Sequence, residues 1–321
     1  MVIRESGVVG VNQSRKLSGL RIALLAVLGT LLFFTGISAS ADAATRSVAS
    51  GGSDSGDCTL SACATINYAV TQANPGDEIS IGAGTFNAAS GTSTALINKA
   101  DLSIVGAGQN QTTVRPPAVS QASAFELTDG ADGLTLRDLK ITSPNVNPLT
   151  QSLSGIYAAN GSNYTVSGVT IDRVTIQGLN WGIRSADTGS GSPNPPMLFE
   201  DWTVTDSSVL GNQFGLYFGS RVDGLSVTTS QINGNDYGFY SRYLAYASRR
   251  ANTFNDVLIE DSSINFSGKK GIYLEAASNF TLNRVSIIGT GSQPPVKSDP
   301  DAVPYNGIDI NLKYENDPPA P

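Results

Sequence analysis

A ten-residue pattern of apolar and polar positions recurs along the chain. Its first, third and eighth positions are apolar, and the sixth is apolar in half of the copies and Ser in the others. Alternation over the first three positions predicts a short strand with one buried face. The alternation changes phase before the sixth position, which predicts a tight corner followed by a second short strand. The copies begin at Leu134, Val169, Trp202, Leu225, Val257 and Phe280.

A second unit consists of Gly, an apolar residue and usually Tyr, and it follows each copy at a nearly constant distance. The offset is 13 residues after Val169, Trp202 and Leu225, and 14 after Val257. The shortest full repeat, from Trp202 to Leu225, is 23 residues, which is enough for one coil of a parallel β-helix. The Gly units begin at Gly155, Gly182, Gly215, Gly238, Gly271 and Gly307.

These repeats predict an all-β fold, a single-stranded right-handed parallel β-helix over residues 45–317, followed by a Pro-rich tail at 318–321. A β-sandwich is the alternative, but it would not explain the fixed offsets. Residues 64–73 have apolar positions at helical spacing before Asn74-Pro75-Gly76, which predicts a short helix that caps the first coil. One inward column should contain Ile171, Val204, Val227, Ile259 and Leu282.

The N-terminus predicts export. Basic residues precede an apolar run at 22–37, and Ala39-Ser40-Ala41 and Ala41-Asp42-Ala43 both fit a cleavage site, so residues 1–44 read as a signal peptide. We therefore expect a secreted or cell-surface protein with no stable membrane span after cleavage; an uncleaved anchor is the alternative. The remaining chain has 16 basic and 25 acidic residues, which disfavours nucleic acid as a partner.

The only two cysteines, Cys58 and Cys63, lie five residues apart. In an exported protein such a pair predicts a local disulfide, although two free thiols are the alternative. The chain has no His, which excludes Ser-His-Asp and Cys-His catalysis and any His-ligated metal site.

From Cys58 through ACATINYAVTQANPGDEISIGAGTF to LSIVGAG, the chain resembles the N-terminal segment of bacterial β-helix proteins of the pectin-lyase-like superfamily. With the repeats, the resemblance covers residues 46–317. It implies the fold, but this superfamily contains lyases, hydrolases, epimerases, esterases and surface proteins without known chemistry. The catalytic motifs are not matched: Asn306-Gly307-Ile308-Asp309 is only near the polygalacturonase motif, and Tyr237-Gly238-Phe239 is a fragment of the epimerase motif.

Alignment of the Gly units predicts an outward column with three successive tyrosines, on which sugar rings could lie. Two long insertions, at 185–199 and 241–254, should leave the same corner and flank the coil that contains Tyr217. Arginines gather there, and arginine beside aromatic rings suits an acidic polysaccharide. Alternatively, the tyrosines only stabilise the sheet, and the arginines form a solvated loop that pairs with Asp223 and Asp236. The predicted substrate-binding residues are Tyr217, Tyr240, Arg184, Arg221, Arg242, Arg249 and Arg250.

Two routes to chemistry are open. A lyase could use Arg242 to neutralise a uronate and Tyr240 as the base, whereas a hydrolase could use Glu275 and Asp309 as its two carboxylates. No cofactor or metal site is expected, although Asp299, Asp301 and Asp309 are acids that could hold calcium. The alternative function is a non-catalytic surface or adhesion protein. The last coil has no evident cap, which predicts end-to-end self-association.

Overall fold

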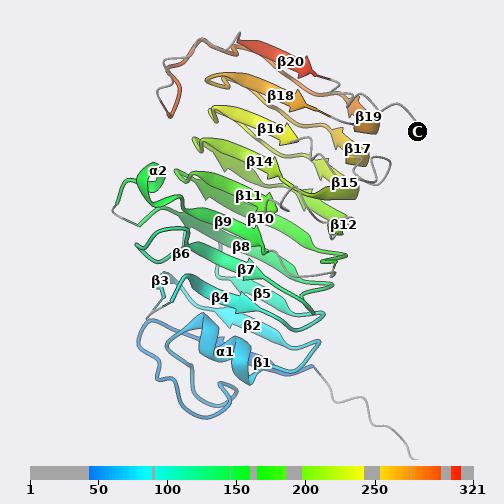
Figure 1. Ribbon diagram of the computed structural model, residues 1–321. Helices are drawn as coiled ribbons and strands as arrows, with labels where there is room; N and C mark the ends of the chain where they lie inside the picture. The colour runs from blue at the N-terminus through cyan, green and yellow to red at the C-terminus, as the bar shows by residue number, and fades with distance from the viewer. Residues whose placement is uncertain are drawn as a thin grey trace, which may run out of the picture. The chain divides into compact units, whose positions relative to one another are not determined.

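The structure is a computed structural model that describes residues 43–88, 91–144, 146–159, 165–185, 197–241, 254–275, 277–297 and 305–311. It confirms the right-handed parallel β-helix. All strand pairs are parallel, and coils stack in sequence from β1 (Thr45–Val48) at one end to β20 (Asn306–Ile310) at the other (Figure 1). The predicted signal peptide and the Pro-rich tail lie outside the described residues.

Two long sheets form the walls of the solenoid in the part of the chain that the structure describes. Sheet A has 12 strands and sheet B has eight. Sheet A contains β1, β2 (Glu78–Ile81), β3 (Gly84–Asn87), β5 (Ser103–Gly106), β6 (Thr112–Arg115), β8 (Thr135–Thr142), β10 (Thr170–Gln177), β12 (Met197–Thr205), β13 (Ser208–Leu210), β15 (Arg221–Thr228), β17 (Phe254–Glu260) and β19 (Ala277–Asn283). Sheet B contains β4 (Ser93–Ile97), β7 (Ser123–Leu127), β9 (Ser154–Ala158), β11 (Trp181–Ser185), β14 (Phe214–Phe218), β16 (Tyr237–Ser241), β18 (Lys270–Leu274) and β20.

The predicted inward column is confirmed. Strand register places Ile171 beside Val204, and the column continues in the same way to Leu282. Its members from Ile171 to Ile259 are at most 1% exposed. The apolar positions of the ten-residue unit therefore form the core between the two sheets.

The phase change within the unit is a left-handed backbone corner. The fifth residue of every copy has a positive φ, between 46° and 58°, which turns the chain while strands such as β8 and β10 continue through it. Non-glycine residues rarely adopt this conformation, so each corner needs compensating contacts. The corner residues are Asp138, Arg173, Asp206, Thr229, Asp261 and Arg284.

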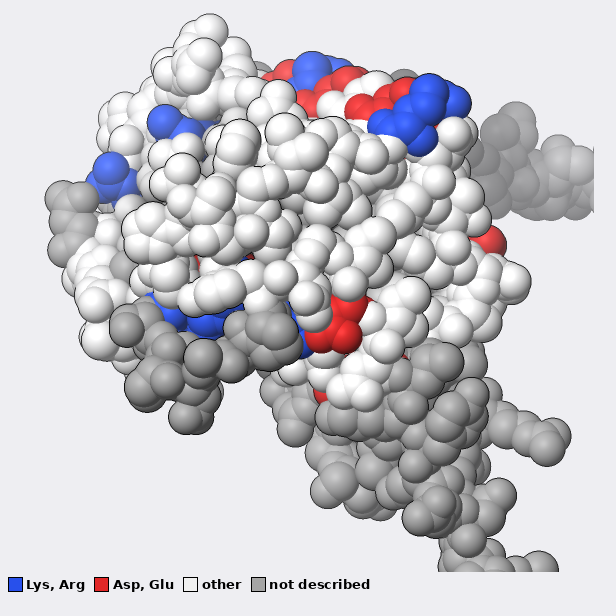
Figure 2. All heavy atoms as spheres, turned by 90° about the horizontal axis from the view of Figure 1, so that it is seen from above, with Lys and Arg blue, Asp and Glu red and all other residues white. Residues whose placement is uncertain are grey.

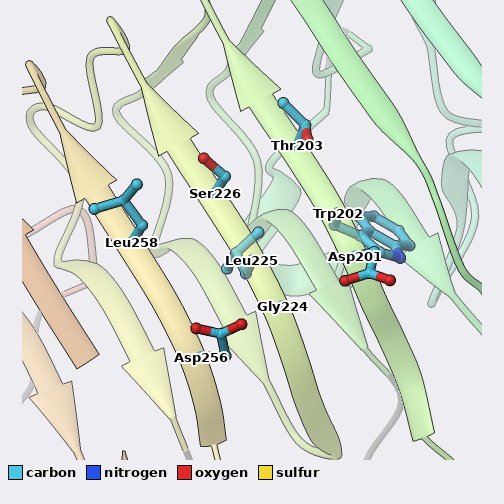
Figure 3. Close-up of a pocket in the computed structure, with 8 residues that line it drawn as sticks. All are labelled: Asp201, Trp202, Thr203, Gly224, Leu225, Ser226, Asp256 and Leu258. Carbon is cyan, nitrogen blue, oxygen red and sulfur yellow. The ribbon is translucent and has the colours of Figure 1, made fainter. Parts of the chain in front are cut away.

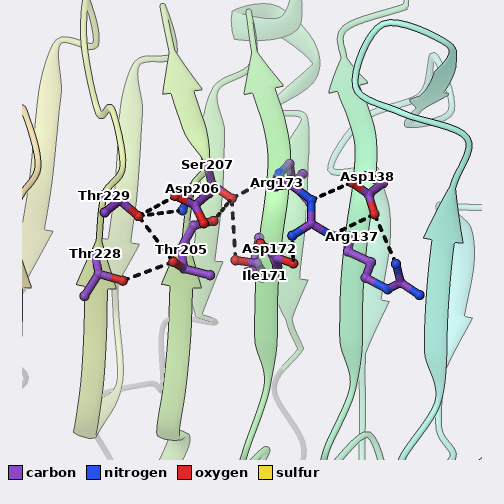
Figure 4. Close-up of polar contacts among 11 residues, drawn as sticks. Arg137, Asp138, Ile171, Asp172, Arg173, Thr205, Asp206, Ser207, Thr228 and Thr229 are labelled. Atoms are coloured by element: carbon purple, nitrogen blue, oxygen red, sulfur yellow. Dashed lines mark hydrogen bonds and ion pairs between the residues drawn. The ribbon is translucent and has the colours of Figure 1, made fainter.

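Side chains along this corner bind one another across the coils (Figure 4). Arg173 donates to both carboxylate oxygens of Asp138 at 2.7 and 2.9 Å, and Thr229 donates to Asp206 at 2.6 Å. Further along, Arg284 holds Asp261 at 2.5 and 2.7 Å. The corner is thus a ladder of ion pairs and hydrogen bonds that runs parallel to the solenoid axis.

Glycine begins the sheet B unit because consecutive coils approach too closely there for any side chain. A Cβ placed on Gly182 or Gly215 would lie 2.5–2.6 Å from the carbonyl oxygen of the next glycine in the column. Beside it, the buried Asn212 and Asn235 form an amide ladder: Asn212 donates its backbone N–H and its Nδ2 to Asn235 Oδ1 at 2.9 and 3.0 Å. The sequence predicted this asparagine ladder.

The N-terminal end is closed on both sheets. Helix α1 (Ile66–Gln72) is the predicted cap, and Asn67 Oδ1 accepts the N–H of Leu96 on the edge strand β4. The predicted disulfide between Cys58 and Cys63 is confirmed, with the two Cα atoms 5.3 Å apart. The segment it closes covers the edge of β1, because Cys58 and Cys63 bind the backbone of Ser47.

A second helix, α2 (Pro148–Gln151), is a single turn between β8 and β9. Neither helix is long and apolar enough to span a membrane, and this finding applies to the described residues.

Candidate functional site

The predicted outward column lies on sheet B, in the predicted order. The register aligns Arg184 with Tyr157 and Tyr217, and Tyr240 with Tyr217 and Tyr273. The ring centroids of Tyr217 and Tyr240 are 5.4 Å apart at 12°, and those of Tyr240 and Tyr273 are 4.9 Å apart at 32°. We call this set the tyrosine ladder.

A second aromatic column runs beside the tyrosine ladder, and the sequence analysis missed it. Trp181, Phe214 and Tyr237 immediately precede their glycines and align across β11, β14 and β16. The rings of Phe214 and Tyr237 stack at 5.0 Å and 11°, and Phe214 also packs edge-on against Tyr240 at 5.3 Å. The signal was in the sequence, as an aromatic residue before three successive Gly units, but the unit was taken to begin at Gly.

The two columns form one interlocked aromatic surface, and its rings are unequally exposed. Tyr217 is 8% exposed and Tyr273 is 9% exposed, so both are largely covered. Phe214, Tyr237 and Tyr240 keep intermediate exposure. The partly exposed part of this surface is therefore centred on Tyr240 and its neighbours in the second column rather than on Tyr217.

Arginine adjoins the aromatic surface at its N-terminal side. The guanidinium carbon of Arg184 lies 4.1 Å from the ring centroid of Tyr157 and 4.2 Å from that of Trp181. Such cation–π contacts orient a guanidinium while leaving its positive charge in place. Arg221 begins β15, the sheet A strand that follows the tyrosine-ladder strand β14.

Lysine and acidic residues adjoin the opposite side. Lys270 continues the second column beyond Tyr237 and forms an ion pair with Asp309, and its Nζ lies 4.4 Å from the ring centroid of Tyr273. Glu275 is buried and accepts a hydrogen bond from the Tyr273 hydroxyl at 2.7 Å. The two carboxylates proposed for a hydrolase are thus held by different partners.

The phenols of this surface are protonated at neutral pH. Burial, with the charge of Glu275, raises the pKa of Tyr240. Burial and the hydrogen bond to Glu275 raise the pKa of Tyr273 to about 12. Both groups are therefore donors of a proton or a hydrogen bond, and the role of base expected for Tyr240 would require removal of a tightly held proton.

Three predicted site residues, Arg242, Arg249 and Arg250, lie outside the described residues, as do Asp299 and Asp301. Within the ranges described, no group of three or more acidic or cysteine side chains is placed to hold a metal ion. The carboxylates expected to pair with the arginines have other partners. Asp223 accepts from Asn255 at 2.8 Å, and Asp236 accepts backbone N–H groups of Val296 and Lys297.

A separate shallow cavity of about 320 Å³ lies on the outer face of sheet A, away from the aromatic surface (Figure 3). The carboxylates of Asp201 and Asp256 flank Gly224, and a Cβ on Gly224 would lie 2.4 Å from Asp201 Oδ1. The sequence analysis did not find this cavity, because it depends on a column of left-handed residues before each ten-residue unit. Its remaining lining is Trp202, Thr203, Leu225, Ser226 and Leu258.

No known protein family and no curated protein matches the sequence. Among solved structures, a Geobacillus virus E2 protein, ORF18, is similar with a TM-score of 0.51 and 12% identity, over 75% of this chain and 48% of that one. The chain thus spans about half the length of that protein.

Carbohydrate-active proteins also appear among the similar structures. A lacto-N-biosidase from Eubacterium ramulus has a TM-score of 0.38 and 14% identity, over 76% of this chain and 57% of that one. The A-module of a mannuronan C-5 epimerase from Azotobacter vinelandii has a TM-score of 0.27 and 14% identity, over 73% and 91%. At these identities the similarities establish only that the chain has the parallel β-helix fold.

Proposed function

We propose that this protein binds an acidic polysaccharide along the aromatic surface of sheet B. One observation carries the proposal: a partly exposed set of stacked rings around Tyr240 adjoins Arg184, whose guanidinium is oriented by Tyr157 and Trp181. Aromatic faces pack against the apolar faces of sugar rings, and a fixed guanidinium matches a carboxylate or sulfate.

The chain would lie across the strands, along the solenoid axis. Successive rings of each column lie about 5 Å apart because adjacent strands do. A polymer placed along the columns would contact a new ring at every coil. Its acidic groups would face Arg184 and Arg221, and also Arg242, Arg249 and Arg250 if their loop adopts the predicted position.

The binding test compares a polyuronate with a neutral glycan, using calorimetry or affinity electrophoresis. Tyr240→Ala should weaken binding of both polymers about tenfold, because loss of a stacked ring costs on the order of 1 kcal/mol. Arg184→Gln should weaken only the polyuronate, and added salt should narrow the difference from the parent. Arg137→Gln, a substitution on sheet A, is the matched control and should bind as the parent does.

Three outcomes are informative. Unchanged binding by both Tyr240→Ala and Arg184→Gln would exclude this surface as the glycan site. Equal loss of both polymers in Arg184→Gln would mean that this residue supports the rings rather than reads charge. A parent protein that binds neither polymer would favour the non-catalytic structural alternative.

Cleavage is the second part of the proposal, with Tyr240, Arg242, Glu275 and Asp309 as candidate residues. Raised pKa values favour Tyr240 and Tyr273 as proton donors to a leaving oxygen. A screen of uronate polymers should follow unsaturated product and new reducing ends, because the first reports a lyase and the second also reports a hydrolase. Tyr240→Phe keeps the ring, so it should retain binding and lose turnover if the phenol transfers the proton.

A further inference from the structure

The solenoid has one closed end and one open end. At the N-terminal end, Asn67 covers the edge of β4 and the disulfide segment covers the edge of β1. At the other end, β20 pairs only with β18 and β19 pairs only with β17 among the described strands. The outer edges of β19 and β20 therefore present backbone N–H and C=O groups that no described strand binds.

The apolar core is exposed at the same end. Ile308 and Ile310 continue two inward columns, directly after Ile272 and Leu274. Ile272 and Leu274 are at most 2% exposed, whereas Ile308 is 46% exposed and Ile310 is 60% exposed. Phe280 and Leu282 of β19, and Ile287 after it, also lose the complete burial of their columns and only partly pack on the core. We call these five residues and the two strand edges the open end.

Charge does not oppose contact between two open ends. Viewed along the solenoid axis, charged side chains lie around the rim and the centre is uncharged (Figure 2). The rim charges are already paired: Lys270 binds Asp309, and Arg284 binds Asp261 and Glu260. Two identical open ends would therefore not bring like, unneutralised charges together.

We propose that the open end is the interface of a tail-to-tail dimer, in which a second copy of this chain is the occupant. A matching surface needs two strand edges at the same separation around an apolar centre, and the open end of another copy has this outline. The closed N-terminal end does not, so head-to-tail growth is blocked and assembly stops at two. A two-fold axis would place identical residues opposite one another, as in isologous dimers. The sheets would continue across the interface with antiparallel pairing.

Sedimentation velocity over a range of concentrations tests the assembly. The parent should be a dimer, and Ile308→Asp or Ile310→Asp should raise its dissociation constant about a hundredfold, because an unpaired carboxylate would enter an apolar interface. Leu60→Asp is the matched control, since Leu60 is 99% exposed in the disulfide loop at the closed end, and it should remain dimeric. Far-ultraviolet circular dichroism confirms that the variants keep the fold.

A cysteine pair test fixes the orientation without weakening the interface. Both native cysteines are in the disulfide, so a single added thiol reports only on contact between copies. Thr281→Cys on β19 should form a linked dimer on mild oxidation, whereas Thr71→Cys on α1 should not; both positions are exposed. The proposal is overturned by a monomeric parent, by a dimer that survives both Asp substitutions, or by linkage through Thr71→Cys. A monomeric parent that dimerises once residues 312–321 are removed would identify its own tail as the occupant.

Discussion

At the scale of single residues, the glycine column determines how closely the coils stack. Each glycine faces the carbonyl oxygen of the next one, and the hydrophobic residue that follows it turns inward. Two consecutive inward positions are possible only because the first has no side chain. The same local arrangement directs the residue before the glycine, such as Phe214, onto the aromatic surface with Tyr217.

Gly215→Ala should destabilise the protein by about 1–3 kcal/mol, as expected for overpacking. Its Cβ would lie 2.5 Å from the carbonyl oxygen of Gly238 and 2.8 Å from Ile232 Cγ2. Urea unfolding monitored by tryptophan fluorescence measures the change. Gly51→Ala is the control, because a Cβ there meets nothing within 4 Å. Equal stability of the two variants would contradict the close approach.

The sequence indicated the tyrosine ladder because the repeat offset is constant, and constant offsets determine register in a solenoid. It did not indicate how exposed each ring is. The burial of Tyr217 and Tyr273 depends on neighbouring coils and loops, and no local pattern encodes it. The ion pairs of Arg173 and Arg284 were missed for a related reason, since they join residues 23 to 35 positions apart.

At the scale of elements, the capping helix closes the first coil through polar contacts as well as packing. Lys99 Nζ donates to the carbonyl oxygens of Val70, Thr71 and Ala73 at 2.9, 2.8 and 2.5 Å. These carbonyls end helix α1 and have no further turn to accept from. One lysine, held at the C-terminus of the helix, thus attaches α1 to the coil below it.

Lys99→Met should loosen this cap, at a cost of about 1–3 kcal/mol for buried acceptors left unsatisfied. Hydrogen exchange should accelerate in α1, β1 and β4, and remain unchanged in the coils beyond β9. Lys140→Met, on the outer face of β8, is the matched control. A uniform acceleration along the whole solenoid would instead mean that the cap and the coils unfold as one unit.

At the scale of the whole molecule, several paired carboxylates make stability depend on acid in the same direction. Burial raises the pKa of Asp77, but hydrogen bonds from the backbone of Asn74 and Ala44 and from Arg46 outweigh it and leave that pKa low. Hydrogen bonds from Arg173 and Arg284 lower the pKa values of Asp138 and Asp261.

A lowered carboxyl pKa contributes stability that is present above the unfolded value of about 3.9 and is lost as the pH falls through the folded value. The free energy of unfolding should therefore decline below about pH 4. Asp77→Asn should lower it on the order of 3 kcal/mol at pH 7, because Arg46 would be left buried and unpaired, and the difference from the parent should narrow at pH values below this range.

The control for this titration is Asp129→Asn, an exposed position that should follow the parent at every pH. Asp236 acts in the opposite sense, since burial raises its pKa and its charged form is the less favoured one in the folded state. If the parent gained stability on acidification through pH 4, the Asp236 effect would outweigh the paired carboxylates.

The glycine column also limits how the length of this protein can change. A single-residue insertion inside a coil would shift every glycine after it out of contact with the carbonyl it faces, and would move the tyrosine ladder out of line. Loss or duplication of a complete coil, such as the 23 residues from Trp202 to Gly224, would preserve all of these contacts. Evolution and protein engineering can therefore lengthen or shorten the aromatic surface only in steps of one coil, which means one ring in each column per step.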